Sequence, residues 1–261
     1  MMTCQNTQRV HEQVRQRYAE LARASSESKT CCKSVGSDRS RRVGYDEADL
    51  ARLPAGADMG LGSGHPVSEA ELQPGETVLD LGCGGGIDLI LAADRVGDAG
   101  QAIGVDMTEE MVATCRRNIT EAGYTNISVH QGWIESLPLD NDSVDVVISN
   151  CVLNLSPDQP AVWREIHRVL KPGGRVAISD IVATRPLPAE LKERPDLLCG
   201  CVAGAVSFES LRGWLEECGF EDVRLEPREE KGRAVTQWLP EDTSGAEVIS
   251  TMIHARKPSD A

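Results

Sequence analysis

The sequence predicts an α/β fold in which helices cover both faces of a mostly parallel sheet. Short apolar runs alternate with amphipathic segments from residue 76 into the last quarter of the chain. The run at 144–149 is almost continuously apolar, as expected of a parallel strand that is covered on both faces. The 261 residues are 40% hydrophobic, which suffices for the core of one large domain.

The first 75 residues are more polar and predict a helical extension. Val10, Val14, Tyr18 and Leu21 recur at helical spacing, so we expect a helix over 5–24. The following residues, 25–42, are rich in Ser, Lys and Arg and predict a linker. We then expect a short helix over 46–51 and a glycine-rich loop over 56–66.

The alternating part of the chain predicts strands and helices in turn. Strands are expected at 77–81, 101–106, 127–130, 144–149, 175–182, 223–226 and 248–255. Helices are expected at 87–96, 108–122, 161–170 and 208–218. Thr108 is suited to cap the second of these helices. Glycines end the last two, within Lys171-Pro172-Gly173-Gly174 and at Gly219.

Composition excludes several classes of partner. A formal net charge of −14 repels phosphate backbones, so we expect no nucleic-acid partner. No apolar run approaches the roughly 18 residues of a membrane span, and we find no signal peptide at the start. Nine cysteines without an export signal indicate a reducing compartment, the cytoplasm. Because no CxxC pair occurs, the cysteine spacing does not fit a zinc ribbon. We expect no metal cofactor, and any cysteine with a role is a free thiol that acts as a nucleophile, a redox partner or a ligand of a soft metal.

The strongest motif is the strand and turn Val78-Leu79-Asp80-Leu81-Gly82-Cys83-Gly84-Gly85-Gly86. Glycines after such a strand let the backbone approach a ligand at the sheet's carboxyl edge. Asp80 suits a cationic group, such as the amino group of S-adenosylmethionine, and would repel a pyrophosphate. Asp106, at the end of the second strand, can accept hydrogen bonds from ribose hydroxyls, as in nicotinamide enzymes too.

Together with Gly132-Trp133-Ile134-Glu135 and Lys171–Gly174, these residues resemble the class I S-adenosylmethionine methyltransferases over about 65–225. The resemblance implies a Rossmann-like, seven-stranded sheet whose last strand is antiparallel. It also implies S-adenosyl-L-methionine as cofactor, with Trp133 and Ile134 along the adenine. Asn150 either contacts the amino-acid end of the cofactor or forms a turn. The implied cofactor-binding residues are Asp80, Gly82, Cys83, Gly84, Gly86, Asp106, Met107, Trp133, Ile134 and Asn150.

Two further segments carry cysteines toward the same edge of the sheet. Ser149–Leu155 follows the fourth strand, and Cys199–Ala205 lies in the insertion after the fifth strand, where such enzymes build a lid. Two thiols that converge over a sulfonium indicate a soft, thiophilic substrate. We interpret Cys115 and Cys218 as packing residues, since free cysteines are usually small hydrophobes.

These segments, with Cys31-Cys32 and Asp106-Met107-Thr108, resemble the arsenite S-adenosylmethionine methyltransferases. The resemblance implies that Cys151 and Cys201 bind trivalent arsenic and that Cys32, or its neighbour Cys31, takes part in binding and in disulfide chemistry. The implied activity is methylation of arsenite for detoxification. A thiol reductant such as glutathione or thioredoxin would restore trivalent arsenic. We expect a monomer with a small-molecule substrate.

On this resemblance, residues 1–64 form an N-terminal helix and a cysteine-containing linker or cap. Residues 65–228 form the methyltransferase domain with a lid around 183–206, and residues 229–261 add a strand that completes the sheet.

One residue departs from the pattern of the arsenite enzymes. They commonly have a cysteine between glycines before the first strand, where this chain has Ser63. A hydroxyl is neither a soft ligand nor a redox partner, so we expect a slower second methylation, or the use of Cys31-Cys32 or Cys199 instead. Two other functions stay open: a C- or O-methyltransferase acting on a quinone, sterol or other small molecule, and a non-catalytic arsenic-binding protein.

Overall fold

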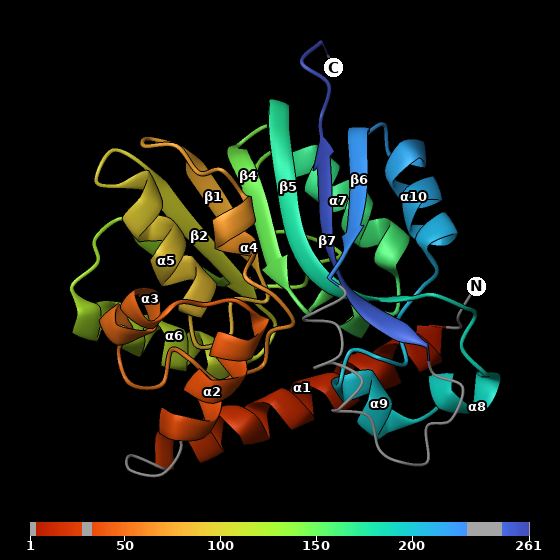
Figure 1. The fold of residues 1–261 in the computed structure, drawn as a ribbon, viewed down its shortest axis with the longest axis horizontal. Helices are drawn as coiled ribbons and strands as arrows, with labels where there is room; N and C mark the ends of the chain where they lie inside the picture. The colour runs from red at the N-terminus through yellow and green to blue at the C-terminus, as the bar shows by residue number, and fades with distance from the viewer. Residues whose placement is uncertain (1–3, 28–32, 229–246, 261) are drawn as a thin grey trace.

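The computed structural model describes all residues except 1–3, 28–32, 229–246 and 261. Within the described residues, seven strands form one sheet in the order β3-β2-β1-β4-β5-β7-β6 (Figure 1). Their bounds are β1 Thr77–Leu81, β2 Gln101–Asp106, β3 Ile127–Gln131, β4 Val144–Asn150, β5 Leu170–Ala183, β6 Glu221–Pro227 and β7 Val248–Arg256. The strands β1 to β5 are parallel, and β7 is antiparallel to both β5 and β6. The predicted mostly parallel sheet with an antiparallel last strand is therefore confirmed.

Helices cover both faces of this sheet. Their bounds are α1 Cys4–Glu27, α2 Lys33–Val43, α3 Glu47–Arg52, α4 Pro66–Glu69, α5 Ile87–Val96, α6 Glu109–Ala122, the 3₁₀ turn η1 Leu153–Leu155, α7 Gln159–Val169, α8 Ala189–Lys192, α9 Pro195–Cys199 and α10 Phe208–Glu217. One core joins α7 and α10 to the sheet around Trp163, Leu211 and Leu215. On the other face, α4, α5 and α6 pack through residues such as Val67, Leu91 and Val112.

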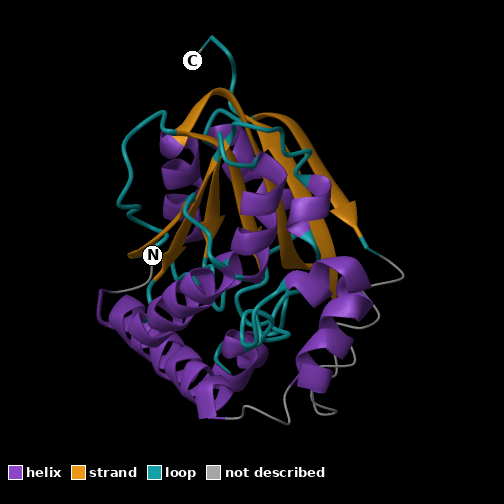
Figure 2. Ribbon diagram, turned by 90° about the vertical axis from the view of Figure 1, so that its left-hand side faces the viewer, coloured by secondary structure: helices purple, strands orange, loops and turns teal. Residues whose placement is uncertain are grey.

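The order of strands reverses between β1 and β4, because the chain moves outward to β3 and then returns to β4. In open α/β sheets, ligands bind at the carboxyl ends of strands beside such a reversal. The long helix α1 runs across this edge of the molecule, below the strand ends in Figure 1 and separate from the layers on the sheet faces (Figure 2). It packs against α6 and α9. The fold therefore places a helix of the N-terminal extension over the expected ligand site.

The prediction of a linker at 25–42 is wrong for residues 25–27, which end α1, and for residues 33–42, which lie in α2. This segment is polar, but its end is anchored by Val43 and Tyr45, which are buried against Val78 and Leu91. Ser40 Oγ also donates a hydrogen bond to Asp58 Oδ1 at 2.7 Å. Tertiary contacts of this kind override weak helix propensity. The short helices α8 and α9 in the lid region were also not predicted.

The fifth strand begins at Leu170 instead of Arg175, so the glycines at 173 and 174 lie inside it. Gly173 has a φ of 78°, and the pairing of β4 with β5 shifts register between Val144 and Val146. An irregular strand start of this kind has no signature in hydrophobic periodicity. No helix among the described residues is both long enough and apolar enough to cross a membrane.

Trp163 offers a test of the core on the α7 face. Its side chain is fully buried and meets the ring of Phe220 edge-on at 6.2 Å, while its indole N–H has no acceptor among the described residues. We expect Trp163→Ala to lower the free energy of unfolding by about 3–5 kcal/mol, because it leaves a large cavity. Trp163→Phe keeps most of the apolar volume and removes the unpaired donor, so we expect a loss below about 1.5 kcal/mol. Urea unfolding followed by circular dichroism measures both, and equal losses would contradict this account of the core.

Candidate functional site

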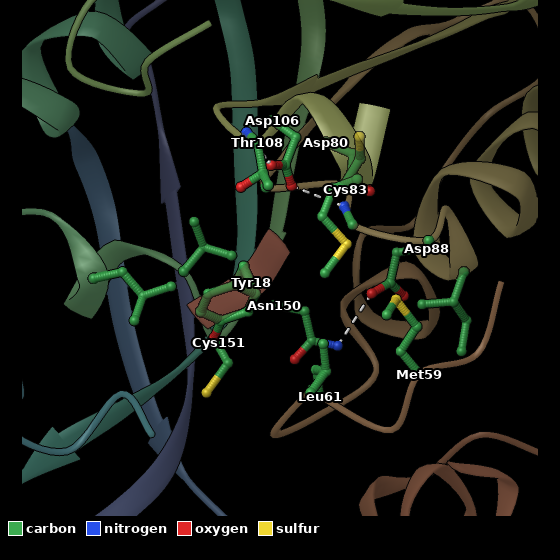
Figure 3. A pocket seen from close by; sticks show the side chains of 18 of the residues that line it. Tyr18, Met59, Leu61, Asp80, Cys83, Asp88, Asp106, Thr108, Asn150 and Cys151 are labelled. Carbon is green, nitrogen blue, oxygen red and sulfur yellow. Dashed lines mark hydrogen bonds between the residues drawn. The ribbon is translucent and has the colours of Figure 1, made fainter. Parts of the chain in front are cut away.

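A pocket opens at the carboxyl ends of β1, β2 and β4, with α1 along one side (Figure 3). It holds about 1020 Å³ of space not filled by atoms, its mouth included. Nine of the ten predicted cofactor-binding residues line it: Asp80, Gly82, Cys83, Gly84, Asp106, Met107, Trp133, Ile134 and Asn150. The tenth, Gly86, lies beneath as the N-cap of α5, with a φ of 97°.

In the turn after β1, position 82 requires glycine for two reasons. Its φ of 68° lies in the left-handed region, and a Cβ atom there would overlap the side chain of Val152. Gly82 and Cys83 both donate backbone hydrogen bonds to the carbonyl of Val105, at 2.7 and 3.2 Å. The loop is thus held against β2 and the segment after β4.

Asp106 is fixed at the end of β2 by the backbone. Its Oδ1 accepts from the N–H of Thr108 at 2.8 Å and its Oδ2 from the N–H of Gly84 at 3.1 Å. Burial raises the pKa of Asp106, although these hydrogen bonds act in the opposite direction.

Two more buried carboxyl groups stand near Asp106. Burial raises the pKa of Asp80 well above its ordinary value, and the charge of Asp88 raises it further. Burial also raises the pKa of Asp88. A cationic ligand would stabilise the ionised forms of these acids, so the pocket favours a positively charged group.

Asn150 ties the 61–64 loop to the sheet. Its Nδ2 donates to Tyr45 Oη at 2.9 Å, to the Gly64 carbonyl at 2.8 Å and to Asp88 Oδ2 at 3.1 Å. Its Oδ1 accepts from the N–H groups of Ser63 and Gly64. Asn150 lines the pocket, but its polar atoms are bound to protein groups, so it positions its neighbours. Neither interpretation of Asn150 from the sequence, a cofactor contact or a turn, included this role as a bridge between the loop and the sheet.

Cys151 and Cys201, which stand 50 residues apart in the sequence, meet beside the pocket. The Sγ of Cys201 donates a hydrogen bond to the carbonyl of Cys151 at 2.7 Å. Their sulfur atoms and a carboxylate oxygen of Asp180 all lie within 4.8 Å of one another. Cys151 lines the pocket, whereas Cys201 lies behind it; their exposed fractions are 6% and 2%. Interaction with Cys151 and then burial raise the pKa of the Cys201 thiol.

Both cysteines have positive φ angles, 63° for Cys151 and 61° for Cys201. The left-handed region disfavours side chains other than glycine, and such strain collects at functional sites. The positions are therefore held by surrounding contacts.

Asp180 and Asn154, neither of which is among the predicted site residues, supply those contacts. Asp180 Oδ2 accepts from the N–H groups of Leu153 and Asn154 at 2.9 and 3.3 Å, and its Oδ1 accepts from Asn154 Nδ2 at 2.9 Å. Asn154 Nδ2 also donates to the Cys201 carbonyl at 3.0 Å. Because Asp180 is occupied by N–H donors, its carboxylate organises the two cysteines and is a poor candidate for a metal ligand.

The other predicted thiols divide into three groups. Cys31 and Cys32 lie outside the described residues. Cys83 and Cys115 are buried against each other, and a hydrogen bond between them raises the pKa of Cys83. Cys199 and Cys218 are half-buried. Burial raises the pKa of Cys199, and the nearby charge of Arg17 opposes that change.

Two residues of α1 complete the pocket and were not predicted to do so. His11 lies 3.0 Å from Glu135 Oε1, and its ring centroid is 4.4 Å from that of Trp133. Tyr18 lies beside Cys151 and donates from Oη to the Cys199 carbonyl at 3.3 Å (Figure 3). The helical spacing of Val10, Val14 and Tyr18 was the available signal for this face of the helix.

The buried carboxyl group of Asp180 predicts a pH-dependent stability. Burial raises its pKa to about 7, against about 3.9 in an unfolded chain. The native state therefore holds a proton that unfolding releases, and this contribution to stability is full below about pH 4 and is lost as the pH rises toward 7. We expect the free energy of unfolding of the wild type, relative to Asp180→Asn, to fall by roughly 4 kcal/mol over that range. Urea titrations at several pH values measure this difference, and parallel curves for the two proteins would refute it.

Comparison with known proteins agrees with this geometry. Residues 72–238 match a methyltransferase domain family. The chain is 43% identical to an arsenite methyltransferase of Halobacterium salinarum, over 99% of this chain and 69% of that protein. It is 36% identical to the arsenite methyltransferase of Aquipseudomonas alcaligenes, over 83% of this chain and 63% of that protein.

A solved structure is also similar. The arsenic(III) S-adenosylmethionine methyltransferase CrArsM of Chlamydomonas reinhardtii superposes with a TM-score of 0.60 at 32% identity, over 81% of this chain and 72% of that one. The chain spans about two thirds of the length of the bacterial and archaeal relatives. The shared domain, the extent of identity and the paired cysteines beside the pocket lead to one conclusion: the chain belongs to the arsenite methyltransferase family of class I S-adenosylmethionine-dependent enzymes.

Proposed function

We propose that this chain methylates trivalent arsenic that is bound by the thiolates of Cys151 and Cys201. The observation that carries the proposal is the meeting of these two buried cysteines beside the pocket that the Asp80–Gly84 turn and Asp106 line. Thiolates are the preferred protein ligands of soft, thiophilic elements. The enzyme class and the family support the same reaction.

The buried acids of the pocket fit S-adenosylmethionine. When bound, this cofactor supplies an electrophilic methyl group on a sulfonium. Asp80 would hold its cationic amino group, and Asp106, kept in place by Gly84 and Thr108, would accept from the ribose hydroxyls. Trp133 and Ile134 would lie along the adenine. Tyr18 and α1 would exclude water from the sulfur end of the pocket.

The binding of arsenite needs no separate base to accept the protons of the two thiols. Each cysteine thiol loses its proton as an As–S bond forms, and an arsenic-bound hydroxide takes that proton and leaves as water. Two such exchanges leave arsenic on two thiolates with its lone pair free. The protein then fixes the direction of that lone pair toward the methyl carbon, and a well-oriented arrangement of this kind can lower the barrier by about 7–11 kcal/mol at the upper end.

Methyl transfer oxidises arsenic from the trivalent to the pentavalent state, because the new As–C bond uses the lone pair. We propose that a thiol reductant such as glutathione or thioredoxin supplies the two electrons that restore trivalent arsenic. Cys32, or Cys31, stays a proposed participant. The many free thiols favour a reducing cytoplasm as the site of this reaction, and we propose a monomer that detoxifies arsenic.

Loss of either thiol should remove the reaction. We expect Cys151→Ser and Cys201→Ser each to lower the rate of arsenite methylation by about 100-fold or more, because one remaining thiolate cannot fix the direction of the lone pair. Arsenic speciation after incubation with arsenite, glutathione and S-adenosylmethionine measures the product. Cys218→Ser, which removes a half-buried thiol at the end of α10, is the control. Methylated arsenic from both site variants at the control rate would contradict the proposed function.

The presence of Ser63 in place of a cysteine predicts different rates for the first and second methylation steps. Its hydroxyl lies 3.0 Å from Ser179 Oγ in a fully buried position and provides neither a soft ligand nor electrons. We therefore expect the second methylation to be slower than the first, by about tenfold, in single-turnover experiments that separate chemistry from product release. Ser63→Cys should narrow the gap. Equal rates for the two steps in the wild type would remove this idea.

A further inference from the structure

The Ser63 side chain cannot deliver electrons to arsenic, because a hydroxyl does not form a disulfide. Ser63 is 1% exposed, its hydroxyl pairs with Ser179 Oγ, and its carbonyl accepts from Ser250 Oγ at 2.8 Å. This segment is thus fastened to β5 and β7 by hydroxyl groups. If the proposed function is right and a cysteine of this chain passes electrons to arsenic, that cysteine lies elsewhere, next to the arsenic-binding pair.

Cys199 is placed for that role. It is the last residue of α9, and only Gly200 separates it from Cys201. The N–H of Cys201 donates to the Leu198 carbonyl at 2.9 Å, which closes a turn around Cys199 and Gly200. Gly200 has φ −93° and ψ 14°, a turn conformation. In such a turn the flanking Cα atoms lie about 5.4 Å apart, within the range of about 4.4–6.8 Å that a disulfide spans.

The helix α1 anchors this turn from the pocket side. Tyr18 Oη donates to the Cys199 carbonyl, and the Tyr18 ring packs against the cluster that contains Cys151 and Cys201. The backbone at Cys199 is therefore held by the same residue that borders the arsenic-binding pair.

The three thiols differ in access to solvent. Cys151 and Cys201 are almost fully buried, at 6% and 2% exposure, whereas Cys199 is half-buried. Thiol–disulfide exchange needs an approach to one sulfur of the disulfide. An external thiol can reach a Cys199–Cys201 disulfide at the Cys199 sulfur without entering the arsenic site.

We propose that Cys199 is a catalytic redox residue that reduces pentavalent arsenic together with Cys201; this inference rests on the proposed function. After methyl transfer, arsenic is pentavalent and carries the sulfurs of Cys151 and Cys201. The sulfur of Cys199 attacks the sulfur of Cys201, and an S–S bond forms. The As–S bond to Cys201 breaks and leaves its electron pair on arsenic, which becomes trivalent. The proton of the Cys199 thiol passes to solvent, and a low-molecular-weight thiol or a dithiol protein later reduces the disulfide.

The direct test maps disulfides after one turnover. The full chain, fully reduced and freed of external thiol, is incubated with one equivalent each of arsenite and S-adenosylmethionine, then acid-quenched and treated with a thiol-alkylating reagent. Trypsin cleavage after Lys192 and Arg212 yields a peptide in which Cys199 and Cys201 are the two cysteines. We expect this peptide to lack both labels and to be lighter by two hydrogen atoms, in proportion to the methylarsenic formed. Omitting S-adenosylmethionine should leave both cysteines free to be labelled.

A variant pair tests the same step by kinetics. We expect Cys199→Ser to lower the ratio of the steady-state rate to the single-turnover rate by about tenfold or more, because oxidised arsenic is no longer reduced on the enzyme. Cys218→Ser, which also removes a half-buried thiol, should keep the wild-type ratio. Circular dichroism checks that both variants are folded.

The outcomes separate this inference from the proposed function. Methylarsenic without a Cys199–Cys201 disulfide, or with the disulfide on Cys31 or Cys32, would overturn the role of Cys199 and leave arsenite methylation standing. A wild type that forms no methylarsenic under any reducing condition would overturn the proposed function and this inference together. A Cys199–Cys201 disulfide in proportion to product supports both.

Discussion

The hydrogen bonds that Asp180 collects hold the candidate site together. Asp180 lies near the end of β5, in the centre of the sheet, and accepts from the turn that follows β4. That turn contains Asn154, whose amide reaches the Cys201 carbonyl in the lid. One buried carboxyl group thus connects the strand that ends at Asn150, the strand that ends at Ala183 and the segment after α9. The ladders of β4 with β5 and of β5 with β7 hold the two strands, whereas the turn after β4 and the segment after α9 lie outside these ladders.

The positive φ angles of Cys151 and Cys201 follow from this connection. A non-glycine residue in the left-handed region costs on the order of 1–2 kcal/mol. A hydrogen bond to Asp180 contributes about 0.5–1.5 kcal/mol while the acid is neutral and about 1.5–3 kcal/mol once it is ionised. The Asp180 and Asn154 contacts can therefore offset the strain at both cysteines. The two thiols therefore stand together in the structure, so a ligand that bound both sulfurs would cost little conformational entropy of the protein.

The elements with local patterns were predictable from the sequence. The β1 strand, the glycine turn after it and the position of Asp106 follow from apolar runs, glycines and a strand end, and all lie where expected. The helix α2 was missed because its stability comes from Val43 and Tyr45, which bury against residues far along the chain. The short α9 has too few residues for a periodic signal.

The residues of the proposed cofactor site were largely predictable from the sequence, whereas the meeting of the two cysteines proposed to bind arsenic was less so. The approach of Cys201 to Cys151 could be inferred only through resemblance, since 50 residues without a regular pattern separate them. Asp180, Asn154, His11 and Tyr18 act through contacts between distant segments, so only weak local signals pointed to them, such as the place of Asp180 near the end of a predicted strand. Polar residues inside an apolar string, such as Asn154 within Leu153–Leu155, were the available signal, because a buried amide needs partners.

Charge and burial divide the pocket into two chemically different ends. At one end, Asp80, Asp88 and Asp106 concentrate buried carboxyl groups that a cation would stabilise. At the other end, Cys151 and Cys201 sit in an apolar cluster with Leu155, Ile181 and Val202. Interaction with Cys151 and burial raise the pKa of the Cys201 thiol, so this sulfur keeps its proton until a soft ligand displaces it.

The helix α1 spans both ends on a single face, since His11 meets Trp133 and Glu135 while Tyr18, two turns later, meets the cysteines. The seven residues from His11 to Tyr18 advance about 10 Å along the helix axis, which is about the length of a nucleoside. The helix α1 therefore contacts residues at both ends of the pocket at once. The N-terminal extension is therefore part of the pocket wall, since His11 and Tyr18 of α1 both line the pocket.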